Sequence, residues 1–413
     1  MLFAASHQAD SASRVVITGA GIITAYGLGW KVNAAGFRAG RVAFRPVSLF
    51  DVSRQRAKVA GEVELPGTQP QTALSLRCFR RMERGAKMLL LAAEEAWRQS
   101  GWAPSENLPV VLGTTSAGMS LGEDFYRQAI QSPDSQRRQA TRILHYQAQR
   151  QALNLADAFG FAGPITIIAN ACASGANAIG HAWELLRRGR AQRVLTGGYD
   201  ALSQLVFSGF DSLQILSTTQ CRPFDADRDG LTLGEGAAVL ALESLEHARR
   251  RGAEILGEIL GYGAGTDGHH LTQPHPDGEA AVASMAAACR QARVGPEQID
   301  YLNAHGTGTP LNDHSEAVAI NRWAGQHAAS LPVSSVKSGI GHLLGGAGAA
   351  EAVACLMALR EGWLPPTANL RTPEPACAFE LVRRPREALL QCALSNSFGF
   401  GGANATLILR RWS

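Results

Sequence analysis

The sequence predicts an α/β protein in which helices cover the faces of the sheets. Short apolar runs that end in small residues alternate with stretches of helical periodicity along the whole chain. The 413 residues are 46% hydrophobic and 18% charged, which is typical of a globular enzyme. This length accommodates two domains or one large duplicated unit. Because no Pro- or Ser-rich linker interrupts the chain, we expect the two halves to share a core.

The expected strands follow one another at regular intervals, and each runs into a turn of small residues or into a helix. The first unit, at residues 13–27, is a buried strand followed by a glycine turn. In the unit at 236–252, three arginines and a glycine end the predicted helix. The remaining units lie at residues 108–119, 165–171, 192–202, 298–310, 331–342 and 393–409.

The net charge of +4 is mild and excludes few classes of protein. Nucleic-acid-binding domains usually carry a concentrated basic stripe, so we expect no nucleic-acid partner. No apolar run approaches the ~18 residues of a membrane span. Residues 1–13 lack a basic segment and a long apolar stretch, so we interpret them as a flexible leader rather than a signal peptide.

The seven cysteines are odd in number and form no CxxC pair. This pattern argues against a disulfide framework and a thiolate zinc site, and it favours a reducing, cytoplasmic compartment. The cysteines occupy positions 78, 172, 221, 289, 355, 377 and 392.

Three motifs suggest ligands but match only in part. GAGIIT begins like a dinucleotide fingerprint, yet Thr24 stands where the third glycine is needed. DADRDG copies the first half of a calcium loop, but its twelfth position is Gly236 instead of a glutamate. His269, His270 and His275 form a cluster without a flanking carboxylate or a second ligand pair, which favours an exposed polar loop or a pocket rim over a metal site.

Four further stretches each set a reactive or polar side chain among small residues. Cys172 follows an apolar strand and precedes a helix, whose free N–H groups and dipole favour a thiolate. An inert buried cysteine is the alternative at this position. His305 follows another strand, and Lys337 and His342 share a third stretch. In the fourth, NSFGFGGAN, Phe398 and Phe400 alternate with glycines.

Together these stretches resemble the β-ketoacyl-[acyl-carrier-protein] synthases, in particular the chain-elongating synthase II. The similarity runs from about RVVITGAGI to ATLIL. It implies the thiolase fold, a duplicated five-layer αβαβα architecture, with the nucleophile in residues 14–253 and the two histidines in residues 254–413. The motifs that carry it are ACASG, PFDADRDG…GEGA, NAHGTGTPLND, VKSGIGHLLGGAGAAE and NSFGFGGAN.

The resemblance implies a decarboxylative Claisen condensation of an acyl thioester with a malonyl-carrier, catalysed by an acyltransferase. It places the catalytic triad on Cys172, His305 and His342. It also implies that Lys337 pairs with Glu351 or Glu316. Phe400, next to Phe398, would act as a gate and share an oxyanion hole with the nucleophile. Thr307, Thr309, Thr272 and His270 would bind the substrate arm.

The same resemblance implies no metal and no free cofactor, because the phosphopantetheine arm belongs to the acyl carrier protein. It implies a homodimer, or a heterodimer with a chain-length factor. A basic run in a predicted helix would dock the acidic carrier, although a solvated helix face is the alternative. This run contains Arg77, Arg80, Arg81, Arg84 and Lys87.

Two segments depart from the family pattern. Residues 136–160 are more polar than expected, with Tyr146, Gln147, Gln149 and Gln151, and TTSAGM has small residues where a bulky aliphatic is common. Fatty-acid synthesis and a specialised polyketide or polyene pathway therefore stay open.

Three rival functions make different demands on the sequence. A non-catalytic chain-length factor would lack the nucleophilic cysteine, which is present here as Cys172. A degradative thiolase would have a second cysteine where Phe398 and Phe400 stand. A generic cysteine hydrolase would need a water-activating arrangement, of which the sequence shows no sign.

Overall fold

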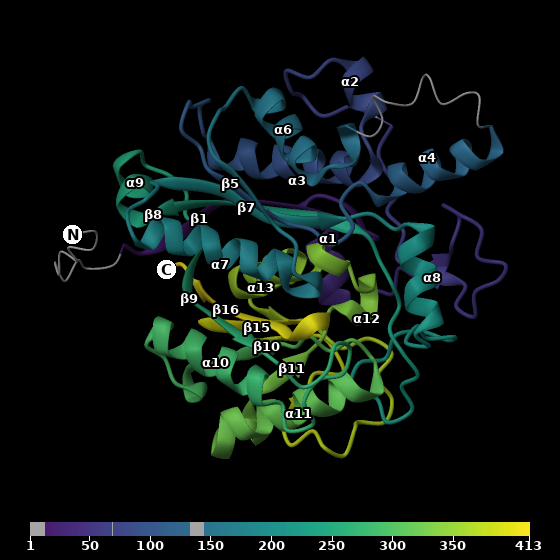
Figure 1. Cartoon of the computed structure of the whole chain (residues 1–413). Helices are drawn as coiled ribbons and strands as arrows, with labels where there is room; N and C mark the ends of the chain where they lie inside the picture. Colours follow the sequence, from purple (N-terminus) through teal and green to yellow (C-terminus); the bar gives the residue numbers. More distant parts are fainter. Residues whose placement is uncertain (1–12, 68, 133–143) are drawn as a thin grey trace, which may run out of the picture.

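The computed structural model describes residues 13–67, 69–132 and 144–413, and it has five layers (Figure 1). Helices α3 (Arg84–Ser100) and α6 (Ala148–Phe159) cover the first sheet. Helices α7 (Ser174–Arg187) and α13 (Ala347–Glu361) form the central layer. Helix α10 (Glu279–Ala292) packs on the outer face of the second sheet, next to α11 (Pro310–Ala324). The predicted five-layer αβαβα architecture is confirmed.

The two sheets repeat one strand order. The first runs β6-β5-β7-β8-β1 and the second β11-β10-β15-β16-β9, so both read 3-2-4-5-1 in chain order. Hydrogen bonds between β1 and β9 join the sheets at one edge. The strands of the first sheet are β1 (Val15–Thr24), β5 (Val110–Gly113), β6 (Ile165–Ile168), β7 (Arg193–Asp200) and β8 (Gly236–Ser244). Those of the second are β9 (Gly257–Thr266), β10 (Tyr301–Asn303), β11 (Pro332–Ser334), β15 (Cys392–Gly399) and β16 (Ala403–Arg411), with β13 (Glu380–Leu381) beyond β11.

Shorter elements surround these layers. The remaining helices are α1 (Trp30–Ala39), α2 (Leu76–Arg81), α4 (Met119–Gln131), α8 (Gln204–Ser212), α9 (Leu245–Arg250) and α12 (Lys337–Ile340). The remaining strands are β2 (Gly27–Leu28), β3 (Arg45–Pro46), β4 (Val59–Ala60), β12 (Trp363–Leu364) and β14 (Arg386–Glu387).

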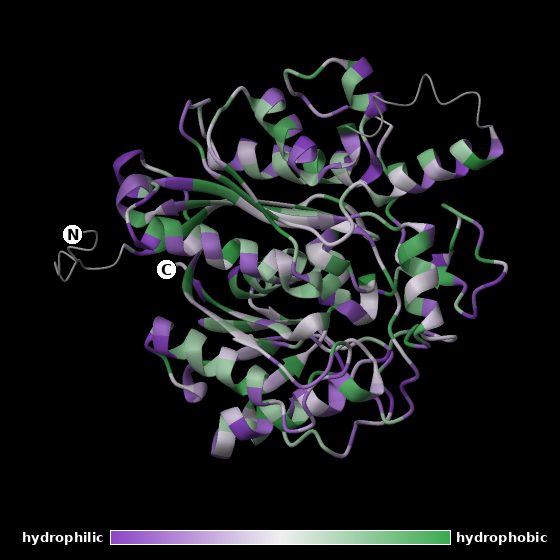
Figure 2. Cartoon of the chain, in the orientation of Figure 1, coloured by the Kyte–Doolittle hydropathy of each residue, from purple (hydrophilic) through white to green (hydrophobic). Residues whose placement is uncertain are grey.

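The central layer is held at backbone-to-backbone distance by small residues. A Cβ added to Gly175 of α7 would lie 2.7 Å from the carbonyl oxygen of Gly345, and one added to Gly348 of α13 would lie 2.8 Å from the nitrogen of Ala176. Any larger side chain would therefore push the halves apart. Apolar residues follow the two sheets, whereas hydrophilic ones concentrate on the outer helices and loops (Figure 2).

Each strand unit expected from the sequence is present, so those predictions are confirmed. The boundary between residues 253 and 254 stays a prediction, and it falls in the turn between α9 and β9. Of the expected leader, residues 1–12 lie outside the described residues. All seven cysteines are free thiols. Within the described chain, no helix has the length and apolar character needed to span a bilayer.

Glu83 supports a prediction about the pH dependence of stability. This buried carboxylate caps α3 at the amide of Ala86 and accepts a hydrogen bond from Ser120. Burial raises its pKa to about 7. Between about pH 4.5 and 7 the folded state thus keeps a proton that the unfolded chain releases, so raising the pH favours unfolding.

We expect Glu83→Gln to remove roughly 1–3 kcal/mol of the loss in unfolding free energy between pH 5 and pH 8. The amide keeps an oxygen that accepts from the backbone of Ala86, its NH2 group replaces the second oxygen and can donate to the Ser120 hydroxyl, and the group cannot ionise. Urea unfolding of both proteins at pH 5, 6, 7 and 8 measures the effect. Equal pH slopes for the two proteins would contradict it.

Candidate active site

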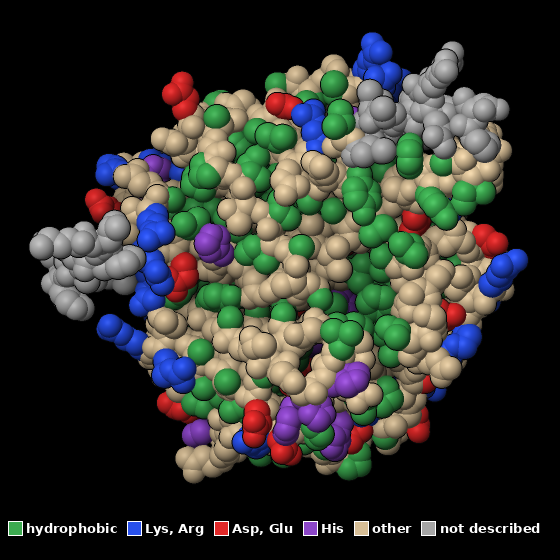
Figure 3. Space-filling view, in the orientation of Figure 1, with side chains coloured by type: hydrophobic (Ala, Val, Ile, Leu, Met, Phe, Trp, Pro, Cys, Tyr) green, Lys and Arg blue, Asp and Glu red, His purple; other side chains and the backbone are tan. Residues whose placement is uncertain are grey.

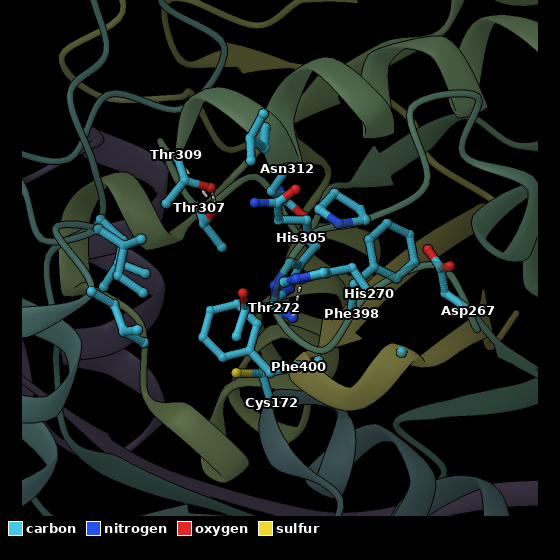
Figure 4. Close-up of a pocket in the computed structure, with 18 of the residues that line it drawn as sticks. Cys172, Asp267, His270, Thr272, His305, Thr307, Thr309, Asn312, Phe398 and Phe400 are labelled. Atoms are coloured by element: carbon cyan, nitrogen blue, oxygen red, sulfur yellow. Dashed lines mark hydrogen bonds between the residues drawn. The ribbon is translucent and has the colours of Figure 1, made fainter.

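Cys172 sits on a sharp turn between a strand and a helix. After β6, Ala171 adopts φ +57°, which is uncommon for a residue with a Cβ, and the 3₁₀ turn Ala171–Ala173 leads into α7. The Ser174 hydroxyl braces this turn, accepting from the amide of Asn170 and donating to the carbonyl of Ala171. The turn presents the Cys172 thiol to a cavity of about 370 Å³ (Figure 4). Cys172 is buried but lines this cavity, so its role as the nucleophile stays a prediction that the geometry allows.

The second half of the chain supplies the other walls of this cavity. His305 follows β10, His342 follows α12, and Phe398 and Phe400 lie at the end of β15 and in the turn after it. All nine residues predicted for the triad, the gate and the substrate arm line the cavity: Cys172, His270, Thr272, His305, Thr307, Thr309, His342, Phe398 and Phe400.

The two imidazoles are neutral and edge-on to each other, with ring centroids 5.3 Å apart. Burial, reinforced by the charge of Lys337, holds the pKa of His305 and of His342 well below the usual value. Nδ1 of His342 accepts the amide of Leu344 at 3.1 Å, and Nδ1 of His305 faces the Lys337 ammonium at 3.3 Å. Both rings therefore carry their proton on Nε2 and act as hydrogen-bond donors.

Lys337 is a buried ammonium with three partners. It pairs with Glu351 of α13, donates to the His305 carbonyl at 2.7 Å and faces Nδ1 of the same histidine. The pairing with Glu351 agrees with the sequence prediction, but an ion pair with Glu316 does not form. Instead, Glu316 accepts the amides of His305 and Gly306 at 2.8 and 2.7 Å, and its burial raises its pKa to about 7.

The expectation that the helix terminus stabilises a thiolate needs correction. Burial raises the pKa of the Cys172 thiol to about 12, and the positive charge of Lys337 offsets this only in part. The thiol is therefore protonated at neutral pH. Because both histidines carry their proton on Nε2, neither presents a free lone pair there to accept the thiol proton.

The turn after β15 approaches the nucleophile closely. A Cβ added to Gly399 would lie 3.1 Å from the amide nitrogen of Cys172. The Phe400 ring stacks on Phe210 of α8 with centroids 5.9 Å apart, and Phe398 lies beside His305 at 5.6 Å. Figure 4 shows the Phe400 ring beside the Cys172 thiol.

Comparison with known proteins identifies the family. Residues 12–248 match the profile described as the N-terminal domain of beta-ketoacyl synthase, and residues 256–371 match that of its C-terminal domain. The chain belongs to the beta-ketoacyl synthase family. It is a condensing enzyme of the acyltransferase class.

Similarity to individual relatives extends over nearly the whole synthase. A 3-oxoacyl-[acyl-carrier-protein] synthase 2 of Synechocystis is 39% identical, over 97% of this chain and 98% of the relative. The solved structure of the ishigamide ketosynthase/chain length factor is 33% identical, with a TM-score of 0.90, over 98% of this chain and 100% of that one. A chain in the solved structure of a type II PKS acyl-carrier protein in complex with its ketosynthase is 27% identical, with a TM-score of 0.87. The similarity covers 97% of this chain and 100% of that one.

Two buried aspartates that organise the synthase's site escaped sequence analysis. Asp200, at the end of β7, accepts the Thr114 hydroxyl at 2.6 Å and the Gly345 amide at 2.7 Å, which ties the two halves together beneath Cys172. Asp313 accepts the amide of Thr307 at 3.0 Å and so shapes the threonine turn. An ionisable residue directly after a buried strand, as in TGGYD, was the available signal for Asp200.

The predicted docking run divides into exposed and buried parts. Arg77, Arg80 and Arg81 are exposed on α2, at the top of Figure 1, and none of them lines the cavity. Arg84 instead pairs with the buried Glu235, so it does not belong to a docking surface. Lys87 is half-buried and lies over the Phe79 ring at 5.8 Å.

The calcium-like motif DADRDG serves the loops around it. Asp225 accepts the amides of Arg371 and Thr372 at 2.6 and 3.0 Å. Asp229 accepts the Ser217 hydroxyl at 2.7 Å. These hydrogen bonds hold the neighbouring loops in place, so the two carboxylates have a structural role. His270 lies at the cavity rim, as the interpretation of the histidine cluster predicted.

The segments that depart from the family pattern lie near the site only in part. Thr114 and Ser116 of TTSAGM both bind Asp200, so these small residues form a rigid turn. Gln151 is buried in α6, and Tyr146 is exposed. Of the polar segment, residues 136–143 lie outside the described residues.

The buried ion pair leads to a prediction about stability. We expect Lys337→Met to lower the unfolding free energy by about 3–5 kcal/mol, because it leaves Glu351 as an uncompensated buried charge. The double variant Lys337→Met/Glu351→Leu should recover most of this loss. Urea denaturation of the parent, both single variants and the double variant measures the coupling. Additive losses in the double variant would show that the charges act independently.

Proposed function

We propose that Cys172 carries the acyl group during a decarboxylative condensation with a malonyl-carrier thioester. The observation that carries this proposal is the joint arrangement of one thiol and two Nε2–H donors in one cavity behind an aromatic gate. Family membership supports the reaction class. The residue roles are those that the family resemblance implies, and the geometry of the cavity supports them.

In the first half-reaction, the Cys172 sulfur attacks the thioester carbonyl of the acyl-carrier. A new C–S bond forms, the bond to the pantetheine sulfur breaks, and the thiol proton leaves with the pantetheine thiol. The backbone amides of Cys172 and Phe400 would stabilise the oxyanion, and the approach of Gly399 to Cys172 brings these segments together.

In the second half-reaction, a malonyl thioester occupies the emptied cavity and loses carbon dioxide. Negative charge then develops on the thioester oxygen, where two Nε2–H donors from His305 and His342 would stabilise it. The resulting carbanion attacks the acyl carbon, the bond to Cys172 breaks, and the sulfur takes up a proton. Lys337 fixes the tautomer of His305 and is a positioning residue in this scheme.

The substrate arm would enter along Thr307 and Thr309, whose hydroxyls lie 2.8 Å apart in the cavity wall, near Thr272 and His270. The phosphopantetheine belongs to the carrier, so the enzyme itself needs no resident cofactor in this proposal. The exposed arginines of α2 are proposed to dock the acidic carrier.

A partner chain is the second part of the proposal. Helix α4 has no buried residue, and Tyr126 and Ile130 are 68% and 62% exposed on it. Leu205 of the neighbouring α8 is also exposed. Contiguous apolar surface of this kind usually marks a protein interface. A second copy of this chain, or a chain-length factor like that named with the ishigamide ketosynthase, would cover it.

Covalent acylation provides the direct test of this function. We expect a mass gain of one acyl group when the protein is incubated with acyl-carrier thioesters, and no gain in Cys172→Ala. Intact-mass spectrometry across a panel of acyl donors measures both. The preferred donor identifies the substrate class. No acylation from any donor would contradict autonomous catalysis and favour a subunit that needs its partner, for which co-purification is the next step.

Carrier docking is tested by reversing charge on α2. We expect Arg77→Glu/Arg80→Glu/Arg81→Glu to raise the KM for an acyl-carrier substrate about tenfold or more, with little change in kcat. Turnover of a small acyl-pantetheine thioester should stay at the parent level, because it does not use the surface. An unchanged KM for the carrier would exclude α2 as the docking surface.

A further inference from the structure

Two arginine-rich segments, about sixty residues apart in the sequence, meet at the end of the molecule opposite the nucleophile. One follows α7 and contains Arg190 and Arg193, and the other ends α9 with Arg251. They meet because β7 and β8 pair antiparallel, with Arg193 opposite Glu243. Arginine and lysine side chains gather on the left edge of the molecule, where α7 and α9 end (Figures 1 and 3).

These arginines line a cavity of about 750 Å³. Its wall contains three guanidinium groups, from Arg190, Arg193 and Arg251, together with His247, and it contains no acidic residue. The turns that precede β5 and β6 close the cavity. It therefore lies at the amino ends of these parallel strands, whereas Cys172 follows the carboxyl end of β6.

The carboxylate of Glu243, which lies opposite Arg193 in the sheet, is already fully engaged. Glu243 is buried behind the cavity and accepts hydrogen bonds from Arg251, Thr18, Trp102 and His247. Burial acts to raise its pKa, but these hydrogen bonds outweigh that effect and lower it to about 2, so the group is ionised at neutral pH. Arg251 is the arginine that pairs with Glu243 directly, and the charge of this carboxylate also acts on Arg193 from farther away.

Two guanidinium groups of the cavity have no directly paired carboxylate among the described residues. Within the described residues, neither Arg190 nor Arg193 has a carboxylate within 4 Å of its side-chain nitrogens. Arg193 is half-buried over the Trp102 ring at 5.5 Å, and its one hydrogen bond, to the Ala103 carbonyl, is long at 3.4 Å. A partly desolvated cation without a directly paired carboxylate, next to the cation of Arg251, favours binding of an anion.

We propose that this cavity is a binding site for a phosphorylated small molecule that carries at least two negative charges. Planar guanidinium forks match the geometry of phosphate oxygens, and those of Arg190 and Arg193 have no carboxylate within 4 Å among the described residues. The volume is in the range of small-molecule sites and exceeds what a single phosphate fills. Ser105 and Asn107 in the wall add polar groups for the remainder of such a ligand. A pyrophosphate group, free or part of a nucleoside diphosphate, has the required chemistry.

Isothermal titration calorimetry of the full chain with inorganic pyrophosphate and with ADP tests the site. Both titrations are carried out at an ionic strength held constant with NaCl. We expect Arg190→Gln/Arg193→Gln to weaken binding at least tenfold, and Arg193→Lys to weaken it less, since it keeps the charge but loses the fork. Tighter binding of ADP than of pyrophosphate would identify the nucleotide as the source of the group, and the reverse would identify the free anion.

Arg188→Gln is the matched control, because Arg188 pairs with Glu184 and does not line the cavity. It should bind pyrophosphate as the parent does. Thermal melts without ligand show whether each variant is folded, and acylation of Cys172 should be unchanged in all of them. The proposal is overturned if the parent shows no binding beyond that of the NaCl control, or if Arg190→Gln/Arg193→Gln binds as tightly as the parent.

Discussion

The active site depends on one buried ammonium. Lys337 joins α12, the β10 turn and α13 by contacts to Glu351 and to both the carbonyl and the ring of His305. A lone buried charge would be strongly destabilising, so the lysine and glutamate require each other. The same contact directs the His305 proton to Nε2, and the charge helps to keep both imidazoles neutral. Stability and chemistry therefore rest on the same group.

Close packing of the central layer explains how two half-chains build one cavity. Glycines in α7 and α13 allow backbone contact, and Asp200 binds the Gly345 amide across the halves. The repeated strand order supports an origin by duplication: each half turns from its third strand toward a central helix. Ala171 and Leu344, three residues before α7 and α13 respectively, both have positive φ. Only the first of these turns carries a cysteine.

Burial of charge has opposite consequences at the two ends of the fold. Around Cys172, desolvation suppresses ionisation of the thiol and the histidines, which leaves neutral donors and a neutral nucleophile. Around Glu243, the hydrogen bonds from Arg251, Thr18, Trp102 and His247 outweigh desolvation and keep the carboxylate ionised. Arg251 pairs with Glu243, and the guanidinium groups of Arg190 and Arg193 in the same cavity have no such direct pair among the described residues. Desolvation opposes ionisation at both places. Whether a group ionises depends on how many hydrogen-bond donors and opposite charges surround it.

The sequence by itself determined the strand units and the α/β class, because apolar periodicity is a local property of the chain. The duplicated five-layer architecture and the nine cavity residues were implied by the resemblance of its motifs to a known family. Tertiary structure alone decided which carboxylate meets Lys337, since Glu316 and Glu351 are equally plausible along the sequence but only Glu351 reaches the ammonium. Tertiary structure also showed that Arg84 pairs with Glu235, so it is not available for docking like its neighbours in the basic run. This pairing could not be recognised in the sequence, because Glu235 lies 151 residues away. Tertiary structure also decided the protonation state of Cys172. Its burial raises the pKa of the thiol, and burial cannot be recognised from the position of the cysteine before a helix.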